Sequence, residues 1–237
     1  MKNSSNLSSS LRIMHRRKLK MNDKVMLVFA PHPDDEVLGV GGTIAKRAKQ
    51  GVKVVDCIVT QGKDHWIRKN EALEANHELG ISETIFLNFP DLHLDRVDHA
   101  IFTQSILEVI KAYKPFEVFL PHPGDLHTDH KALTASAMVA LRAKYRDSPI
   151  IAYTYETLSE TGIDYQNPQN VFNPNVYVDI TSSIKDKINA LRKHESQIER
   201  FPCSRSEVSV DALAIYRGSQ AGMARAEAFS LIRRYER

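Results

Sequence analysis

Two short polar segments of this 237-residue chain combine imidazole and carboxylate side chains at a spacing that suits metal chemistry. The first is PHPDDE at residues 31–36, directly after the apolar run VMLVFA, and the second is HTDH at residues 127–130. An imidazole and several carboxylates next to a buried strand are costly to desolvate unless they bind a cation or react with a substrate. The first segment therefore indicates an active site.

The second segment supplies what the first lacks for a catalytic metal. His32 and Asp35 together with one imidazole of the HTDH segment give two nitrogen ligands and one oxygen ligand, which leaves a fourth position open, as a catalytic zinc needs. The other imidazole is then held and charged by Asp129, which lies between His127 and His130. Asp129 also has an ordinary role available as a helix cap. Taken jointly, the two segments favour a metal site.

The surrounding sequence alternates between strand and helix patterns. Strands are expected at residues 25–30, 53–60, 84–87, 118–120 and 150–155, and helices at 43–50, 66–79, 100–113 and 131–144. This alternation predicts an α/β fold, a parallel sheet covered on both faces. Ligands of such sheets bind beyond the carboxyl ends of the strands, where both polar segments fall, so the active site is expected there.

The alternation weakens after about residue 156. We expect loops over 156–175 and 201–220, a strand over 176–180 and a helix over 182–200. The length and composition, with 42% hydrophobic and 26% charged residues, fit one globular domain, expected at 21–237. Residues 1–20 are Ser-rich and then basic, and they are predicted to be a disordered tail.

Composition limits the partners and the compartment. The net charge is only +3, much of it from residues 12–20, so no nucleic-acid partner is implied. The two cysteines make no disulfide framework, which favours reduced thiols in a cytoplasmic protein. The chain lacks the roughly 7–15-residue apolar stretch of a secretory signal and the roughly 18 apolar residues of a membrane span. A homo-oligomer is left open.

The PHPDDE and HTDH segments resemble the paired motifs of the LmbE-like, or PIG-L, family of zinc-dependent N-acetylglucosaminyl deacetylases. The resemblance extends over most of the chain, through RKNE at 68–71, Pro90-Asp91, KHESQ at 193–197 and AEAF at 226–229. It implies a Rossmann-like three-layer sandwich and hydrolysis of an acetamido group on a sugar, with release of acetate. It also implies a Zn²⁺ held by His32, Asp35 and His130, for which other divalent transition metals can substitute.

The resemblance and the needs of amide hydrolysis together assign roles to the remaining residues. Zinc lowers the pKa of bound water towards about 7 and polarises the carbonyl. Asp34 is the expected general base, and His127, kept cationic by Asp129, is expected to stabilise the tetrahedral oxyanion. Arg68 and Asp91 are expected to bind sugar hydroxyls or a neighbouring polar group. Glu36 is interpreted as structural, accepting backbone N–H groups at a helix start.

The chain departs from the usual family pattern at two places. Pro31 stands where an Ala is commoner, which stiffens the turn without removing a ligand. Lys63 follows Gly62 where the family usually has an acidic residue, which leaves the identity of the substrate open.

Other functions remain as alternatives. A sugar or glycoconjugate is the favoured small-molecule substrate. A metal-dependent amidase that acts on a non-sugar amide would need the same catalytic residues, so it remains an alternative. A nicotinamide-dependent oxidoreductase would use GVGG at 39–42, although this spacing does not match G-x-G-x-x-G. An iron oxygenase would use the H-x-D pair of residues 32–34, but such sites usually occur on all-β scaffolds. A non-enzymatic role has little use for an open metal position.

Overall fold

The computed structural model describes residues 24–62, 64–144, 151–163 and 167–236. The expected tail at 1–20 and the departure at Lys63 lie outside these ranges. Among the described helices, none combines the length and the apolar character that crossing a membrane requires.

Seven strands form a single sheet with the order β3-β2-β1-β4-β5-β7-β6. The strands are β1 Val25–Ala30, β2 Lys53–Thr60, β3 Glu83–Phe89, β4 Glu117–Pro121, β5 Ile151–Tyr155, β6 Val176–Asp179 and β7 Ala226–Arg234. The first five strands pair in parallel, while β7 runs antiparallel to both β5 and β6. The predicted α/β fold with a mostly parallel sheet is confirmed.

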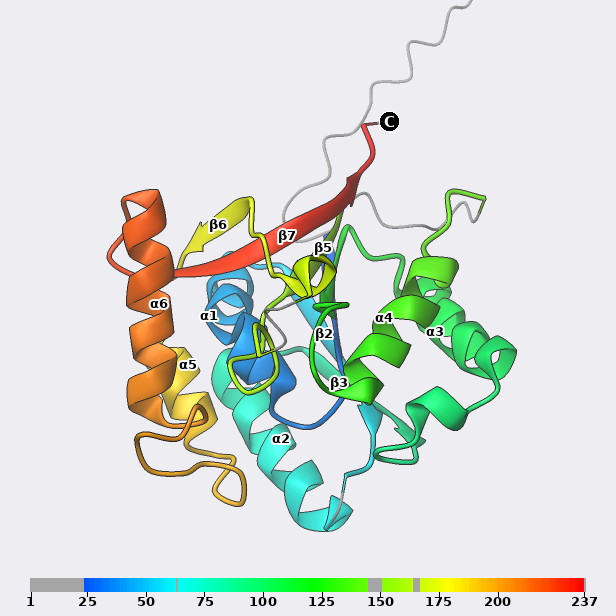
Figure 1. Ribbon diagram of the computed structural model, residues 1–237, viewed down its shortest axis with the longest axis horizontal. Helices are drawn as coiled ribbons and strands as arrows, with labels where there is room; N and C mark the ends of the chain where they lie inside the picture. Colours follow the sequence, from blue (N-terminus) through cyan, green and yellow to red (C-terminus); the bar gives the residue numbers. More distant parts are fainter. Residues whose placement is uncertain (1–23, 63, 145–150, 164–166, 237) are drawn as a thin grey trace, which may run out of the picture.

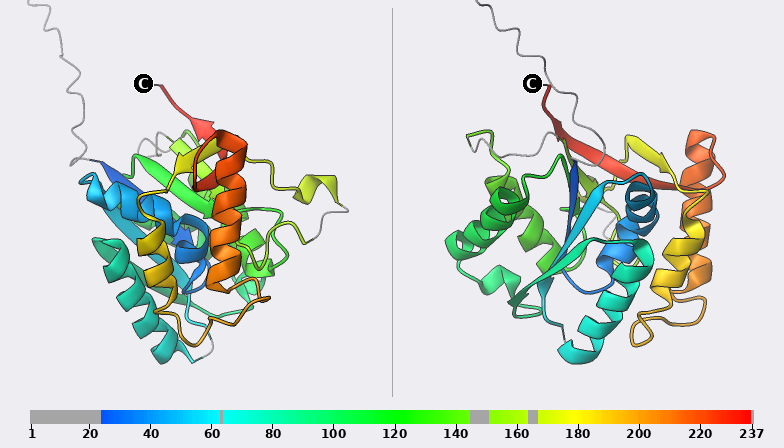
Figure 2. Two further views of the ribbon diagram at one scale, coloured as in Figure 1. Left: turned by 90° about the vertical axis from the view of Figure 1, so that its left-hand side faces the viewer. Right: turned by 180° about the vertical axis from the view of Figure 1, so that it is seen from behind.

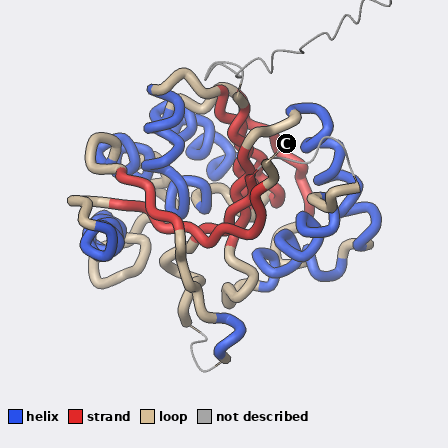
Figure 3. Tube along the Cα trace, turned by 90° about the horizontal axis from the view of Figure 1, so that it is seen from above, coloured by secondary structure: helices blue, strands red, loops and turns tan. Residues whose placement is uncertain are grey.

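Helices cover both faces of the sheet. They are α1 Asp35–Lys49, α2 His65–Leu79, α3 His99–Tyr113, α4 Thr128–Ala140, α5 Ile184–Leu191 and α6 Glu207–Ala221, with short 3-10 turns η2 Leu94–Arg96 and η3 Pro168–Asn170. The helices α1, α2, α5 and α6 lie on one side of the sheet, and α3 and α4 lie on the other (Figures 1 and 2). Seen from above, the strands form a curved layer between the two groups of helices (Figure 3).

The central strand shows why its sequence is continuously apolar. In β1, Leu27 and Phe29 pack into the core on the α3 and α4 side, while Met26 and Val28 pack into the core under α1. Both faces of a strand in a covered parallel sheet are buried, so the usual alternation with polar residues disappears. The rigid centre of the sheet thus fixes where β1 and β4 end and where their polar loops begin.

A buried ion pair between β7 and α5 is hydrogen-bonded to the backbone of α1. The Glu227 carboxylate, at the start of β7, accepts the backbone N–H groups of Gly42 at 2.8 Å and Thr43 at 2.7 Å. Lys187 on α5 lies 2.6 Å from Glu227 and also donates to the Leu38 carbonyl at 2.8 Å. The helix that carries Asp35 is therefore fixed against α5 and β7.

Two expectations for the last third of the chain are wrong. The predicted helix over 182–200 ends at Leu191, and hydrogen-bonded turns follow. Residues 207–221, predicted as loop, form the helix α6, capped by the Ser206 side chain and ended by Gly222 at φ 69°. The buried face of α6 consists of Val210, Ala214 and Gly218. At Gly218 no side chain fits, because a Cβ there would lie 2.5 Å from the Met223 carbonyl oxygen. Such a face gives little apolar periodicity for sequence analysis to detect.

Candidate active site

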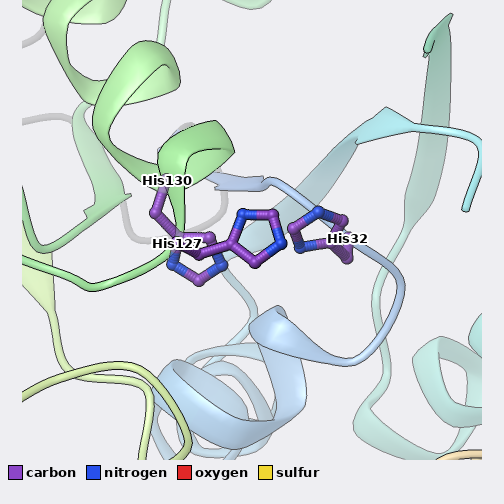
Figure 4. A group of neighbouring side chains, drawn as sticks. All are labelled: His32, His127 and His130. Atoms are coloured by element: carbon purple, nitrogen blue, oxygen red, sulfur yellow. The ribbon is translucent and has the colours of Figure 1, made fainter. Parts of the chain in front are cut away.

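The two polar segments meet at the carboxyl ends of β1 and β4. His32 lies in the loop after β1, and His127 and His130 lie at the start of α4, with the three imidazole rings gathered in one place (Figure 4). One nitrogen from each ring belongs to a group of possible ligand atoms that all lie within 4.8 Å of one another. The sequence-predicted site is therefore assembled in space although its two halves are about a hundred residues apart.

The three predicted metal ligands share one point of contact. The Asp35 Oδ2 atom lies 3.2 Å from His32 Nδ1 and 3.3 Å from His130 Nε2. Donor atoms about 2.0–2.1 Å from a tetrahedral zinc are themselves separated by roughly 3.3 Å, so each of these two distances by itself suits a shared ion. The triads of possible ligand atoms that all lie within 4.8 Å of one another are His32 with His127 and His130, and His32 with Asp91 and Asp129. The exposed fraction of the side chain is 10% for His32, 2% for Asp35 and 1% for His130, so all three possible ligands are shielded from solvent.

The charges in this cluster support cation binding. Burial lowers the pKa of His32, but the carboxylates of Asp129, Asp35 and Asp91 outweigh it and raise that pKa well above its ordinary value. Burial raises the pKa of Asp35, but His130 and His32 bring it well below its ordinary value. A cluster that is this rich in negative charge holds protons on its imidazoles unless a metal ion replaces them.

Asp125 is a functional residue that sequence reasoning missed. Its Oδ2 atom lies 2.8 Å from His130 Nδ1, while its Oδ1 atom accepts a hydrogen bond of 2.5 Å from the Thr161 hydroxyl. A carboxylate on one ring nitrogen fixes the tautomer and leaves the other nitrogen, here Nε2, free to ligate a metal. The available signal was an acid five residues before His130, in the loop that leads into α4.

The Asp34 carboxylate lies between two arginines and accepts no hydrogen bond among the described residues. Its side chain is 2% exposed, Arg68 and Arg205 approach its two oxygens at 3.5 Å, and neither oxygen has a hydrogen-bond partner among the described residues. Burial and the neighbouring Asp35 charge raise the pKa of Asp34, while Arg205 and Arg68 oppose this. Arg205 lies in a segment predicted as a loop and far from Asp34 in the sequence, so sequence patterns could not predict the contact between these two residues.

The backbone of Asp34 is strained. Its φ of 122° is far from the angles that residues with a side chain normally adopt. Such a conformation costs about 1–3 kcal/mol and persists only where the surroundings impose it. Glu36 is one cause, because its Oε2 atom accepts the Asp34 backbone N–H at 3.1 Å. The interpretation of Glu36 as structural is confirmed by this contact.

The expected pairing of His127 with the Asp129 carboxylate is wrong. That carboxylate instead accepts the backbone N–H groups of Leu92 at 2.8 Å and Leu94 at 3.0 Å, and it lies 3.3 Å from His32 Nε2. The Asp129 backbone N–H donates to His127 Nδ1 at 3.2 Å. Burial and the neighbouring His32 and His130 lower the pKa of His127. The lowered pKa favours the neutral imidazole, and the hydrogen bond accepted by Nδ1 favours the tautomer with its proton on Nε2.

The two predicted substrate-binding residues flank the cluster. Arg68, on the first turn of α2, donates to the Pro33 carbonyl at 2.8 Å, and its side chain is 11% exposed. Asp91 Oδ1 lies 3.1 Å from His32 Nε2, and this contact lowers the pKa of Asp91. Asp91 thus contacts the cluster of imidazoles directly, which the sequence did not suggest.

The glycines considered for dinucleotide binding have a packing role. They lie inside α1, where a Cβ at Gly39 would come within 2.2 Å of the Tyr155 ring and one at Gly42 within 2.8 Å of Ile180. A phosphate-binding loop needs its glycines exposed to the ligand. The buried position of these residues therefore removes the motif on which the nicotinamide alternative depended.

Comparisons with known proteins agree with this geometry. The PIG-L family profile, described as GlcNAc-PI de-N-acetylase, matches residues 27–141. A diacetylchitobiose deacetylase of Thermococcus kodakarensis is 27% identical, with 88% of this chain and 83% of the relative aligned. The structure of an N,N'-diacetylchitobiose deacetylase from Pyrococcus horikoshii superposes with a TM-score of 0.73 at 23% identity, covering 98% of this chain and 95% of that one.

A further relative establishes membership. A protein of Bacillus subtilis described as a probable N-acetyl-alpha-D-glucosaminyl L-malate deacetylase 2 is 30% identical, over 73% of this chain and 83% of the relative. Together with the family match and the buried cluster of imidazoles and carboxylates, this identity shows that the chain belongs to the PIG-L (LmbE-like) family and is an N-deacetylase.

Proposed function

We propose that this protein is a zinc-dependent hydrolase that removes the N-acetyl group from an N-acetylglucosaminide-type sugar and releases acetate. The observation that carries the proposal is the convergence of His32 and His130 on Asp35, with the Asp34 carboxylate, which accepts no hydrogen bond among the described residues, beside them. His32, Asp35 and His130 would hold the zinc, with Asp125 orienting His130. Other divalent transition metals can occupy the same donors.

Zinc, when bound, supplies a Lewis acid that polarises the amide carbonyl and makes water a better nucleophile. Asp34 accepts the proton of the attacking water and later delivers it to the departing amine. The Nε2–H of His127 donates a hydrogen bond to the oxygen on which negative charge develops. That role needs a proton on Nε2, which the hydrogen bond from the Asp129 backbone N–H to Nδ1 favours.

The substrate class follows from the relatives and from the flanking residues. The names of the two curated relatives both contain an N-acetylated amino sugar, in one case linked to L-malate. Arg68 and Asp91 reach the edge of the metal-binding cluster and would bind the hydroxyl groups of such a ring. Cys57 and Cys203 are free thiols in the described chain, which suits a cytoplasmic enzyme acting on a small sugar or glycoconjugate.

An acetate-release screen tests the proposal. The zinc-loaded protein is given N-acetylglucosaminides that differ at the anomeric substituent, together with non-sugar N-acetyl amides of similar size. We expect turnover of at least one glycoside and none of the non-sugar amides. Turnover confined to the non-sugar amides would instead identify a metal-dependent amidase.

Metal content tests the ligands separately. Changing His32, Asp35 or His130 to Ala is expected to remove stoichiometric zinc and nearly all activity while the protein stays folded. His77→Ala, at an exposed position on α2, is the matched control and should keep both. Retention of a full metal equivalent by two of the three ligand variants would contradict the assignment.

A further inference from the structure

His194 is a completely buried imidazole for which the reaction described above has no use. It lies in the turns after α5, and its side chain is 0% exposed. Within the described part of the chain, neither ring nitrogen has a hydrogen-bond partner. Its Nε2 atom faces Glu36 Oε1 at 3.6 Å, and Glu36 is also 0% exposed with that oxygen lacking a hydrogen bond. Isolated, each group would be costly to bury; the two together form a buried ion pair.

Charge favours this pairing. Burial alone lowers the pKa of His194, but the carboxylates of Glu36, Asp34 and Glu71 outweigh it and raise that pKa. The imidazolium form is therefore the one that suits the site. Because removal of one partner leaves the other charge buried without compensation, Glu36 depends on His194 for its position.

Glu36 connects this pair to Asp34. One of its oxygens faces His194, and the other accepts the Asp34 backbone N–H at 3.1 Å. That hydrogen bond lies beside the strained Asp34 backbone, whose φ is 122°. A strained residue stays in place only while its surroundings impose the conformation.

We propose that His194 is a positioning residue that holds Glu36 and, through it, keeps Asp34 in the conformation that the reaction requires. The inference rests on the proposed function, since it gives Asp34 the part of the proton acceptor. Among the described residues, the His194 side chain forms no hydrogen bond or ion pair with His32, Asp35 or His130. The competing explanation is that His194 only fills space between α1 and the turns after α5.

A double-mutant cycle separates these explanations. His194→Phe keeps the ring volume and is expected to lower kcat about 10- to 100-fold, the scale of a misplaced reacting group, with KM and zinc content within about twofold of the parent. Glu36→Gln should cause a similar loss, and the double variant should lose no more than either single variant. Losses that multiply in the double variant would overturn the proposal. If His194→Phe fails to fold, His194→Gln takes its place in the cycle.

Ser183→Ala is the matched control. The Ser183 hydroxyl is buried and donates to the Gly42 carbonyl at 2.7 Å, so this change also weakens the contact between α1 and the α5 region. It is expected to lower the thermal midpoint but leave kcat unchanged. A fall in kcat equal to that of His194→Phe would show that loosening of α1 alone explains the effect.

A crystal structure of His194→Phe tests the proposal without any substrate. We expect the hydrogen bond between Glu36 and the Asp34 N–H to be lost and the Asp34 φ to relax to a negative value, with His32, Asp35 and His130 in place. An unchanged Asp34 backbone would overturn the proposal whatever the enzyme acts on. A parent protein that releases no acetate from any sugar would contradict the proposed function alone.

Discussion

At the scale of single residues, Asp34 is distinguished from its neighbour Asp35 by its contacts. Asp35 faces two imidazoles, whereas the Asp34 carboxylate lies between two guanidinium groups and is free of hydrogen bonds within the described chain. One acid is thus suited to hold a cation, and its neighbour to accept a proton.

Asp34→Asn is expected to keep one zinc per chain and a KM within about threefold of the parent. Turnover should fall by roughly 10²–10⁴, the contribution of a positioned general base, because an amide cannot accept the proton. Steady-state kinetics with metal analysis measures both. Near-normal turnover would show that another group is the base.

His127→Gln is expected to lower turnover by roughly 10²–10³ with zinc retained, the scale seen when one oxyanion donor is lost. Asp129→Asn should act differently, because its carboxylate holds the backbone of Leu92 and Leu94 rather than the His127 ring. We expect that variant to disturb the position of Asp91 and so to raise KM. Equal effects of the two substitutions on KM and kcat would contradict these separate roles.

The sequence predicted the residues that belong to compact motifs and missed those that act on them from elsewhere. His32, Asp35 and the HTDH segment could be proposed as ligands because their residue types and spacing match the demands of a metal ion, and the family resemblance selected His130 within that segment. The contacts of Arg205 and His194 could not be predicted, because their partners are more than a hundred residues away; the KHESQ segment marked His194 as part of a motif but did not show its partner. The prediction that the Asp129 carboxylate pairs with His127 was wrong. The carboxylate instead accepts backbone N–H groups of a loop, and such contacts do not depend on the residue types of that loop.

At the scale of helices and strands, the site depends on how α1 is anchored. The N-terminus of α1 carries Asp35 and Glu36, and its middle is held by the ion pair between Glu227 and Lys187. Helix boundaries were predicted well where apolar periodicity is strong, as in α3. They were missed in α6, where the buried face consists of Val210, Ala214 and Gly218.

Lys187→Met is expected to lower the free energy of unfolding by about 3–5 kcal/mol, because it leaves the buried Glu227 charge without its partner. Lys49→Met is a suitable control. Lys49 pairs with Asp186 at 2.6 Å, but its side chain is 60% exposed, so the loss should stay under about 1 kcal/mol. Urea unfolding at one pH compares the two. Equal losses of unfolding free energy in the two variants would mean that the buried pair of Lys187 and Glu227 contributes no more stability than an exposed ion pair.

At the scale of the whole molecule, the fold could be predicted because strand and helix patterns alternate through the first two thirds of the chain. The antiparallel β7 could not be placed between β5 and β6, since the order of strands depends on pairing across long sequence distances. The carboxyl ends of β1 and β4 could nevertheless be expected at the same edge of a parallel sheet, and the observed strand order makes these two strands neighbours.

Zinc should stabilise the whole protein more strongly as the pH rises. In the metal-free protein, burial lowers the pKa of His130, but Asp35 and Asp125 outweigh it and raise it to about 9. A histidine whose pKa is raised on folding contributes stability that is complete below its unfolded value of about 6.5 and is lost as the pH climbs through its folded value. Metal-free stability should therefore fall between about pH 6.5 and 9, whereas zinc binds the neutral imidazoles.

Thermal unfolding with and without one equivalent of zinc, from pH 6 to pH 9, measures this difference. The gap between the two midpoints should widen with pH. His77→Ala should leave that gap unchanged at each pH. A gap that narrows towards pH 9 would mean that protons on these imidazoles do not compete with the metal.

The anchoring of α1 by Glu227 also has a consequence for the order of assembly. The carboxylate and the Gly42 N–H that it accepts are 185 positions apart in the chain. During synthesis, the helix that bears Asp35 is made first, and its anchor is added only 185 residues after Gly42. Contacts of such long range raise contact order and slow folding, and an incomplete chain exposes apolar surface meanwhile. Nascent chains stopped before Glu227 should thus depend on chaperones and lack a finished metal site.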